Sequence, residues 1–237
     1  MISFVIPALN EEKTIEDTLK SLNAFSGEKE IIISDGRSRD RTIEIVKKYT
    51  NKIVVYNEEK KQKISQARND GAKLATGEYV IFVDADVIIP DINDLIKRAE
   101  KYFDRDKKLV AVTAECVVLK DMANVYDIII FKIVAYYFSF LNFIRFGAAG
   151  GEFQMIKREA FLAVNGFDER ITVSEDMDLF WRLAKIGRTK LPLELKVYHT
   201  GRRAHKIGWP KLLWQWISNT VMVFFFKQSD EEWKEIR

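Results

Sequence analysis

Two pairs of carboxylates in this sequence have the type and spacing needed for chemistry. Asp84 and Asp86 are one residue apart and directly follow the apolar run Tyr79–Val83, which is typical of a buried strand. Glu175 and Asp176 form a second pair much later in the chain. Carboxylates this close repel one another unless a cation or water lies between them. Because hard divalent cations prefer oxygen ligands, the first pair predicts a Mg²⁺ or Mn²⁺ site that would meet a phosphorylated substrate.

Residues 1–90 alternate short apolar runs with amphipathic stretches, which is the order of βα units. Strands are expected at 3–6, 30–34, 53–56 and 79–83. Asn10 should cap the first helix between them, and Leu74 should lie on the buried face of the third helix. This order predicts an open, mostly parallel twisted α/β sheet flanked by helices. Such sheets bind ligands at the carboxyl ends of their strands, where Asp84 lies.

The second half of the chain contains two strongly apolar stretches. A long strand is expected over 109–119 and a helix over 122–146, whose polar residues fall on one narrow stripe. Residues 212–226 form a second apolar stretch, rich in aromatic side chains. The helix could cross a bilayer by its length, but a single crossing would separate Asp84 from Asp176. An amphipathic helix on a membrane or against a partner avoids this separation, and a core helix in a larger subdomain is the alternative.

Composition narrows the class of protein and its compartment. The 237 residues are 47% hydrophobic and 31% charged, which is enough for a substantial core. The net charge of +3 does not mark a nucleic-acid binder. The single cysteine, Cys116, suits a reducing compartment, and residues 2–9 look like a strand with no basic segment before them, unlike a signal peptide. We therefore expect a cytoplasmic protein that does not bind nucleic acid.

Polar motifs follow the expected strands in a characteristic order. They read VIPALNEE (5–12), SDGRSRDRT (34–42), ARNDG (67–71), DAD (84–86), GFDE (166–169), SEDMDL (174–179) and WRLAKIG (181–187). Together they resemble the family 2 glycosyltransferases, inverting enzymes of the nucleotide-sugar-binding GT-A fold, over about residues 1–203. The resemblance implies a catalytic domain at 1–204, with a nucleotide-binding half (1–90) and an acceptor half (91–204). An amphipathic, aromatic-rich helical segment at 205–237 would follow.

The resemblance also implies roles for residues in the first motifs. Binding of the nucleotide sugar would fall to Pro7, Ala8, Leu9, Glu11, Asp35, Arg68, Asp84, Ala85 and Asp86. Asp35 would hydrogen-bond the base, and Arg68 would help to hold the base and diphosphate side. Asp86, with Asp84, would coordinate the Mg²⁺ or Mn²⁺ ion that bridges the diphosphate.

The later acidic motif is expected to serve the acceptor. Asp176 begins a predicted helix whose Leu179, Leu183 and Ile186 should point inward, which fixes the carboxylate in the first turn. The resemblance makes Asp176, with Glu175 beside it, the general base for an acceptor hydroxyl. If the acceptor were a polyprenyl phosphate, Asp176 would instead be a positioning or metal-shell residue. An acid that only complements the helix dipole is the other alternative.

A basic segment near residue 200 looks like the Ser-x-Arg-Arg segment found in part of the family. Arg202 and Arg203 could clamp the leaving diphosphate there, and a solvated basic turn is the alternative. His199 and His205 flank these arginines. Each histidine is either a third metal ligand or a packed or surface side chain.

Two departures from the family pattern shape the expected function. Leu9 stands where many relatives have tyrosine, so stacking on the base is lost, and the Gln-x-x-Arg-Trp box of processive synthases is missing at 214–216. We therefore expect metal-dependent transfer of a single sugar from a UDP-, GDP- or dTDP-linked donor. The acceptor would be a lipid or lipid-linked molecule at the cytoplasmic face of the membrane, with peripheral membrane contact. The oligomeric state stays open, and a homo-oligomer fits as well as a monomer.

Three other readings fit parts of the pattern. Asp-x-Asp occurs in ordinary turns, where each side chain caps its own backbone. It also opens phosphatase sites of the haloacid dehalogenase type, but Ile88 stands where those sites have threonine and the pair follows a later strand. A catalytically silent nucleotide-sugar-binding or membrane-scaffold protein would use the apolar helices as its working surface.

Overall fold

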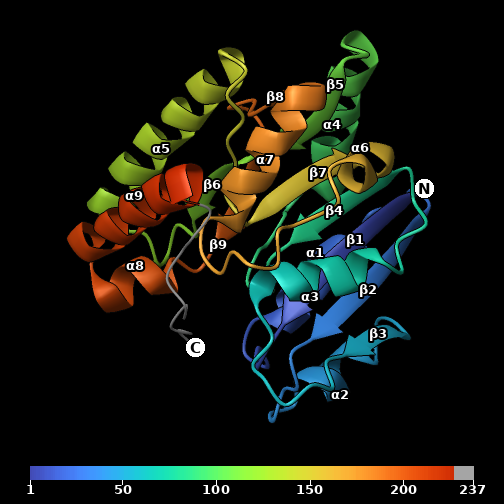
Figure 1. Cartoon of the computed structure of the whole chain (residues 1–237). Helices are drawn as coiled ribbons and strands as arrows, with labels where there is room; N and C mark the ends of the chain where they lie inside the picture. The colour runs from blue at the N-terminus through green and yellow to red at the C-terminus, as the bar shows by residue number, and fades with distance from the viewer. Residues whose placement is uncertain (227–237) are drawn as a thin grey trace.

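A seven-stranded sheet forms the centre of the computed structural model, which describes residues 1–226 (Figure 1). Its strand order is β3-β2-β1-β4-β7-β5-β8, and β7 alone runs antiparallel to its neighbours β4 and β5 in this sheet. The strands are β1 (Ile2–Ala8), β2 (Lys29–Asp35), β3 (Lys52–Val55), β4 (Tyr79–Val83), β5 (Leu109–Thr113), β7 (Phe153–Lys157) and β8 (Arg188–Lys190). The predicted open, mostly parallel α/β sheet is therefore confirmed.

Helices cover both faces of this sheet, so its central strands are apolar on both sides. One face packs against α1 (Ile15–Asn23), α2 (Thr42–Val46) and α4 (Ile92–Arg105). The other packs against α3 (Ile64–Ala72), α6 (Arg158–Ala163) and α7 (Glu175–Ile186). In β4, Ile81 and Val83 face the first layer, and Val80 and Phe82 face the second. This double coverage explains the unbroken apolar run before Asp84.

The long strand expected over 109–119 is wrong, because the chain changes sheets at Ala114. β5 stays in the main sheet, whereas β6 (Glu115–Val118) pairs with β9 (Lys196–His199) in a second, two-stranded parallel sheet. Glu115 N already donates to Leu195 O, at 2.8 Å. An apolar run does not specify the partner of each strand, so the division was not visible in the sequence.

Three predicted helix details are also wrong. Asn10 has a positive φ of 55° and does not cap α1, which begins at Ile15; its Oδ1 accepts a hydrogen bond from Arg39 N instead. Leu74 is exposed because α3 ends at Ala72. Ile186 is exposed because it is the last residue of α7, whereas Leu179 and Leu183 are buried as expected.

Two long apolar helices, α5 (Val125–Phe143) and α9 (Trp209–Phe226), lie beside each other at the β8 edge of the main sheet, where Thr189 of β8 hydrogen-bonds to Asn142 of α5 (Figure 1). The short helix α8 (Arg202–Ile207) leads into α9. Asn124 caps α5, and its side chain and Asp127 form a capping box, so the helix starts at Val125 and is shorter than the expected 122–146. The end of the predicted segment 205–237 lies outside the described residues.

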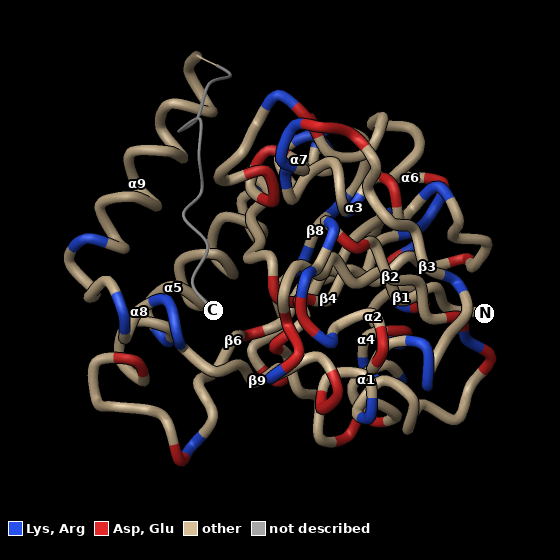
Figure 2. The backbone as a smooth tube through the Cα atoms, turned by 90° about the horizontal axis from the view of Figure 1, so that it is seen from below, with Lys and Arg blue, Asp and Glu red and all other residues tan. Residues whose placement is uncertain are grey.

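The polar stripe of α5 faces the protein together with Phe131, Ala135 and Leu141, and most of its other apolar residues are exposed. Lys132 Nζ lies 3.0 Å from Glu115 Oε1, and Asn142 Nδ2 donates to Ala148 O at 2.7 Å. On α9, Asn219 is likewise buried. The two helices expose Val125, Tyr126, Ile128, Ile129, Ile133, Tyr136, Tyr137, Phe140, Phe143, Trp214, Ile217, Val221, Met222, Phe224, Phe225 and Phe226, and of these Ile133, Tyr137, Ile217, Val221, Phe224 and Phe225 also line the cavity described below. Figure 2 shows this part of the tube almost free of charged residues, except around α8 and the start of α9.

Candidate functional site

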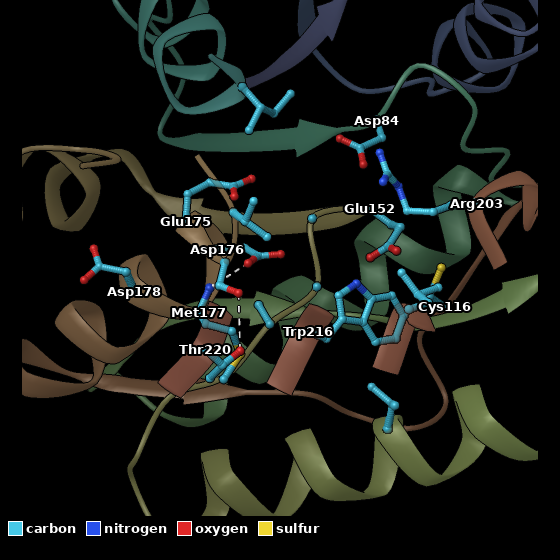
Figure 3. Close-up of a pocket in the computed structure, with 18 of the residues that line it drawn as sticks. Asp84, Cys116, Glu152, Glu175, Asp176, Met177, Asp178, Arg203, Trp216 and Thr220 are labelled. Carbon is cyan, nitrogen blue, oxygen red and sulfur yellow. Dashed lines mark hydrogen bonds between the residues drawn. The ribbon is translucent and has the colours of Figure 1, made fainter. Parts of the chain in front are cut away.

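A cavity of about 1260 Å³ opens at the carboxyl ends of β1 and β4, beside the end of β2. It brings together most of the predicted site residues: Pro7, Ala8, Leu9, Glu11, Arg68, Asp84, Ala85, Asp86, Glu175, Asp176, His199, Arg202 and Arg203 all line it. The parallel strands end at one edge of the sheet, so motifs far apart in the sequence meet there. Figure 3 shows Asp84, Glu175 and Asp176 around this cavity.

Asp35 is the predicted binding residue that does not line the cavity. Its side chain is buried, and its Oδ2 accepts hydrogen bonds from Arg37 N and Ser38 N, both at 2.9 Å. Ser38 Oγ donates to its other oxygen. The cavity is lined instead by the next residue, Gly36. In this structure Asp35 shapes the loop after β2, and contact with a base stays a prediction.

Arg68, on α3, joins the two acid pairs. It is 2% exposed, and its Nη2 donates to Asp84 Oδ1 at 2.9 Å while its Nη1 donates to Glu175 Oε1 at 2.6 Å. Burial alone would lower the pKa of this guanidinium, but the neighbouring carboxylates outweigh burial and raise it. A buried arginine needs such paired acceptors, because an unpaired charge in the interior is costly.

A close approach of the backbone completes the surroundings of Arg68. Gly151 O accepts from Arg68 Nη2 at 3.2 Å. A Cβ atom at Gly151 would lie 2.6 Å from that same nitrogen and 3.5 Å from Asp176 Oδ2. A larger residue here would therefore have to displace the Arg68 guanidinium, which joins the two acid pairs.

Asp86 is held by the segment that precedes and begins α8. Thr200 Oγ1 donates to Asp86 Oδ2 at 2.9 Å, and Arg202 Nε lies 3.2 Å from the same oxygen. Arg202 also contacts both oxygens of Glu11, at 2.8 and 3.0 Å. Arg203 extends toward Asp84 (Figure 3). The two arginines predicted from the sequence thus lie beside the Asp84-Asp86 pair.

The carboxylates at this end of the cavity fit a hard divalent cation. Burial and the charge of Asp86 raise the pKa of Asp84, although Arg68 opposes the shift. Glu152, before β7, has its pKa raised to about 7 by burial and by Asp84 and Asp86. Crowded, buried acids of this kind favour a cation between them, and an all-oxygen donor set suits Mg²⁺ or Mn²⁺. Asp84 and Asp86 are the residues that would hold it.

Sequence reasoning missed Glu152 and the position of Cys116. Ligand atoms of Cys116, Glu152 and His199 all lie within 4.8 Å of one another. His199 Nε2 is buried without a hydrogen-bond partner, and Nδ1 accepts from Gly201 N at 3.4 Å. A neutral ring that accepts at Nδ1 carries its proton on Nε2, so this tautomer offers a donor there and not a metal ligand. A polar residue after two glycines was the available signal for Glu152.

His205 is the other histidine that could have been a ligand, and it does not line the cavity. Its Nε2 lies 2.7 Å from Asp127 Oδ2, and Trp209 Nε1 donates to Asp127 Oδ1 at 2.8 Å. These contacts tie α8 and α9 to the start of α5. The alternative of a packed histidine therefore describes His205 better than a metal ligand does.

Glu175 and Asp176 occupy the first turn of α7, after Ser174 in the left-handed region with φ 64°. Ser174 Oγ lies 3.3 Å from Thr220 Oγ1, which connects this turn to α9. Burial raises the pKa of Asp176 to about 6. Burial and the charge of Asp176 raise the pKa of Glu175 to about 7. Arg68 opposes both shifts. Asp176 is thus a carboxylate with a nearly neutral pKa inside the cavity, which suits proton transfer.

Comparison with known proteins places the chain in a family. The family model described as glycosyl transferase family 2 matches residues 3–162. The poly-beta-1,6-N-acetyl-D-glucosamine synthase of Staphylococcus aureus (strain COL) is 30% identical over 194 residues, which cover 77% of this chain and 45% of that protein. The synthase of Staphylococcus epidermidis is also 30% identical, over 193 residues. The chain therefore spans less than half the length of these curated relatives.

Solved structures support the same fold. A mannosyltransferase from Pyrobaculum calidifontis, in complex with GDP-Man and Mn²⁺, superimposes with a TM-score of 0.70 and 21% identity, covering 93% of this chain and 64% of that one. Glucosyl-3-phosphoglycerate synthase from Mycobacterium tuberculosis, in complex with Mg²⁺ and UDP, superimposes with a TM-score of 0.62 and 18% sequence identity. The match covers 98% of this chain and 81% of that one. The GT-A fold expected from the sequence is confirmed.

Proposed function

The chain belongs to glycosyl transferase family 2, and on this basis we propose that it transfers a sugar from a nucleoside-diphosphate sugar to an acceptor with inversion. One observation carries the proposal: buried Arg68 contacts both Asp84 and Glu175, so the two acid pairs share one cavity. In the proposed function, this cavity would hold the divalent ion near Asp84 and Asp86 and a proton acceptor at Asp176, with the sugar near both. The mannosyltransferase and the synthase with the same fold were solved with GDP-Man or UDP and a divalent ion.

The donor would bind at the ends of β1 and β4. Pro7, Ala8 and Leu9 would line the nucleoside, and Asp84 and Asp86 would hold Mg²⁺ or Mn²⁺. When bound, that ion supplies positive charge to the diphosphate as the bond to the sugar breaks. Arg202 and Arg203 lie beside this position, where a guanidinium can bind phosphate oxygens through two hydrogen bonds.

The acceptor would approach from the side of Asp176. Glu175 is paired with Arg68 at 2.6 Å, which makes it a positioning residue, whereas Asp176 has no such arginine contact among the described residues. If the acceptor is a hydroxyl, Asp176 takes its proton as the oxygen attacks the sugar. If it is an ionised lipid phosphate, Asp176 positions it instead. Either route is a single displacement and inverts the sugar carbon.

The finer parts of the proposal concern the acceptor and the membrane. We place the protein on the cytoplasmic face of a membrane, with a lipid or lipid-linked acceptor and one sugar transferred per reaction. The exposed apolar faces of α5 and α9 support this position, with Lys206 exposed at the end of α8 and Lys211 exposed at the start of α9. By length and composition α5 could also cross a bilayer, a test that a core helix passes too.

Ligand binding tests the donor and the ion together. We expect one of UDP-, GDP- and dTDP-linked sugars to raise the melting temperature in the presence of Mn²⁺ and to lose most of that effect with chelator. A protein that shows no shift with any donor would contradict the enzyme reading. Because a silent binding protein would also pass this test, release of the nucleoside diphosphate must be measured with the same donor.

A further inference from the structure

The cavity continues past Asp176 as an apolar groove between α5 and α9. Its walls are Phe131, Val134, Phe138 and Leu141 from α5, and Trp216, Ile217, Val221 and Phe224 from α9. Aromatic pairs line its edges. The ring centroids of Phe131 and Trp216 lie 6.4 Å apart, and the ring centroid of Phe224 lies 5.1 Å from that of Phe146, on which it stacks, and 5.2 Å from that of Trp181. Among the described residues of α5 and α9, no charged side chain lines this groove.

The groove is continuous with the candidate catalytic acids. Thr220 of α9 lines it and is 3.3 Å from Ser174, which precedes Glu175. In Figure 3, Asp176 lies between Asp84 on one side and Thr220 on the other. A chain lying between the helices would therefore bring its head group to Asp176 without further rearrangement.

The charges at this junction are unsuited to an anionic head group. Arg68 is occupied by Asp84 and Glu175, Arg202 contacts Glu11 and Asp86, and Arg203 extends toward Asp84. All three arginines thus face the donor side, and the lysines that line the cavity, Lys60, Lys61 and Lys63, belong to the loop before α3 and not to the groove between α5 and α9. A phosphate beside Asp176 would meet carboxylates and the diphosphate of the donor in a buried site, where repulsion between like charges is strong.

We propose that the groove between α5 and α9 holds the hydrocarbon chain of the acceptor, and that this acceptor presents a neutral hydroxyl, not a phosphate. The proposal rests on the proposed function. The hydroxyl oxygen forms a bond to the sugar carbon, the bond from that carbon to the diphosphate breaks with its electron pair, and the hydroxyl proton passes to Asp176. A neutral head group brings no added negative charge and supplies the proton that a carboxylate can accept.

Two single-chain amphiphiles separate a neutral head group from an anionic one. Decyl glucoside and decyl phosphate carry the same chain, and each is titrated below its critical micelle concentration into protein that holds nucleoside diphosphate and Mn²⁺. We expect decyl glucoside to bind at least about tenfold more tightly than decyl phosphate, because only the phosphate is repelled. Equal binding, tighter binding of decyl phosphate, or no binding of either amphiphile overturns the proposal.

A variant that fills the groove tests where the chain lies. Val134→Trp should weaken decyl glucoside binding by about tenfold or more, since the larger side chain takes up the space. The control, Ile129→Trp, changes an exposed residue of α5 that does not line the cavity and should leave binding unchanged. Unchanged binding in Val134→Trp overturns the groove assignment.

Nucleoside diphosphate binding is measured on every protein in the series. If wild-type protein binds nucleotide with Mn²⁺ but treats both amphiphiles alike, the inference fails and the proposed function stands. If wild-type protein does not bind nucleotide at all, the proposed function fails first. A Val134→Trp protein that loses nucleotide binding has misfolded, and Leu141→Phe then replaces it under the same criteria.

Discussion

The two ends of the cavity are built in different ways. The donor end lies on the ends of β1 and β4, at the centre of a sheet covered on both faces, and its side chains are charged and paired. The acceptor end lies between α5 and α9, whose outer faces are apolar and exposed. A rigid sheet edge suits the fixed geometry of a diphosphate and a metal ion, and two helices with few charges suit a flexible apolar chain. In the proposed function, the chemistry would be fixed at the first end and the acceptor would be selected at the second.

The largest effect is expected at the donor end. Asp86→Ala should lower turnover by about 10³-fold, because a main ligand of the divalent ion is removed where charge grows during reaction. Donor binding should also lose its dependence on Mn²⁺, as measured by calorimetry. Asp106→Ala is the control, since Asp106 pairs with Arg188 and does not line the cavity. Mn²⁺-dependent donor binding that survives in Asp86→Ala would show that the ion is held elsewhere.

A smaller effect, confined to the chemical step, is expected on the acceptor side. Asp176→Asn should lower kcat by about 10² to 10³-fold, the usual contribution of a general base, and leave the Kd of the donor unchanged. In wild-type protein the pKa of Asp176 is raised to about 6. Turnover should therefore rise with pH up to about 6 and then level off, because the base acts in its ionised form. A donor Kd that changes as much as kcat would place Asp176 in donor binding.

The crowded acids at the donor end should also make stability depend on pH. The pKa of Glu152 is raised from 4.5 to about 7, so the folded state holds this proton more tightly than the unfolded state. Ionised Glu152 then destabilises the fold above about pH 7, an effect that is absent below pH 4.5. In the presence of chelator at pH 8, Glu152→Gln should raise the free energy of unfolding by about 3 kcal/mol, which corresponds to an increase of roughly 5–10 °C in melting temperature.

The same substitution should change little at pH 4.5, where wild-type Glu152 is already protonated. Glu194→Gln serves as the control, because Glu194 does not line the cavity. A gain in melting temperature that is equal at both pH values would mean that the charge of Glu152 is not the cause.

The smallest effect is expected for the outer surface of the helices. Trp214→Ser combined with Phe226→Ser removes two side chains that are 71% and 63% exposed and do not line the cavity. The affinity for liposomes containing anionic lipid, measured by co-sedimentation, should fall by about a hundredfold or more, since each aromatic side chain contributes roughly 1.5–3 kcal/mol when buried in an apolar phase. Donor binding should not change.

Val55→Ser is the matched control for this surface, because Val55 is also exposed but lies on β3, at the edge of the main sheet away from the two helices. If wild-type protein remains in the supernatant, the membrane position is wrong. Equal loss of sedimentation in Val55→Ser would mean that exposed apolar area in general, and not the α5 and α9 surface, causes binding.

Much of the fold could be predicted because local patterns encode it. Residues 79–83 are apolar without a break, which requires a strand covered on both faces, and the acid pair after it must then lie at the sheet edge. The division of 109–119 into β5 and β6 could not be predicted, since an apolar run is compatible with either sheet. Cys116 and Glu152 join the site from β6 and from the segment before β7, so no local motif marks them.

The sequence by itself determined the order of strands and helices in residues 1–90, the motifs at the strand ends and the polar stripe on α5, because these depend on residues close together along the chain. The tertiary structure decided which acids meet. Arg68 lies between Asp84 and Glu175 only after α3 and α7 pack on the same face of the sheet. The tertiary structure also turned the polar stripe of α5 inward, because Lys132 and Asn142 find Glu115 and Ala148 there. Contacts between distant residues give this orientation its favourable free energy, and periodicity within one helix cannot supply it.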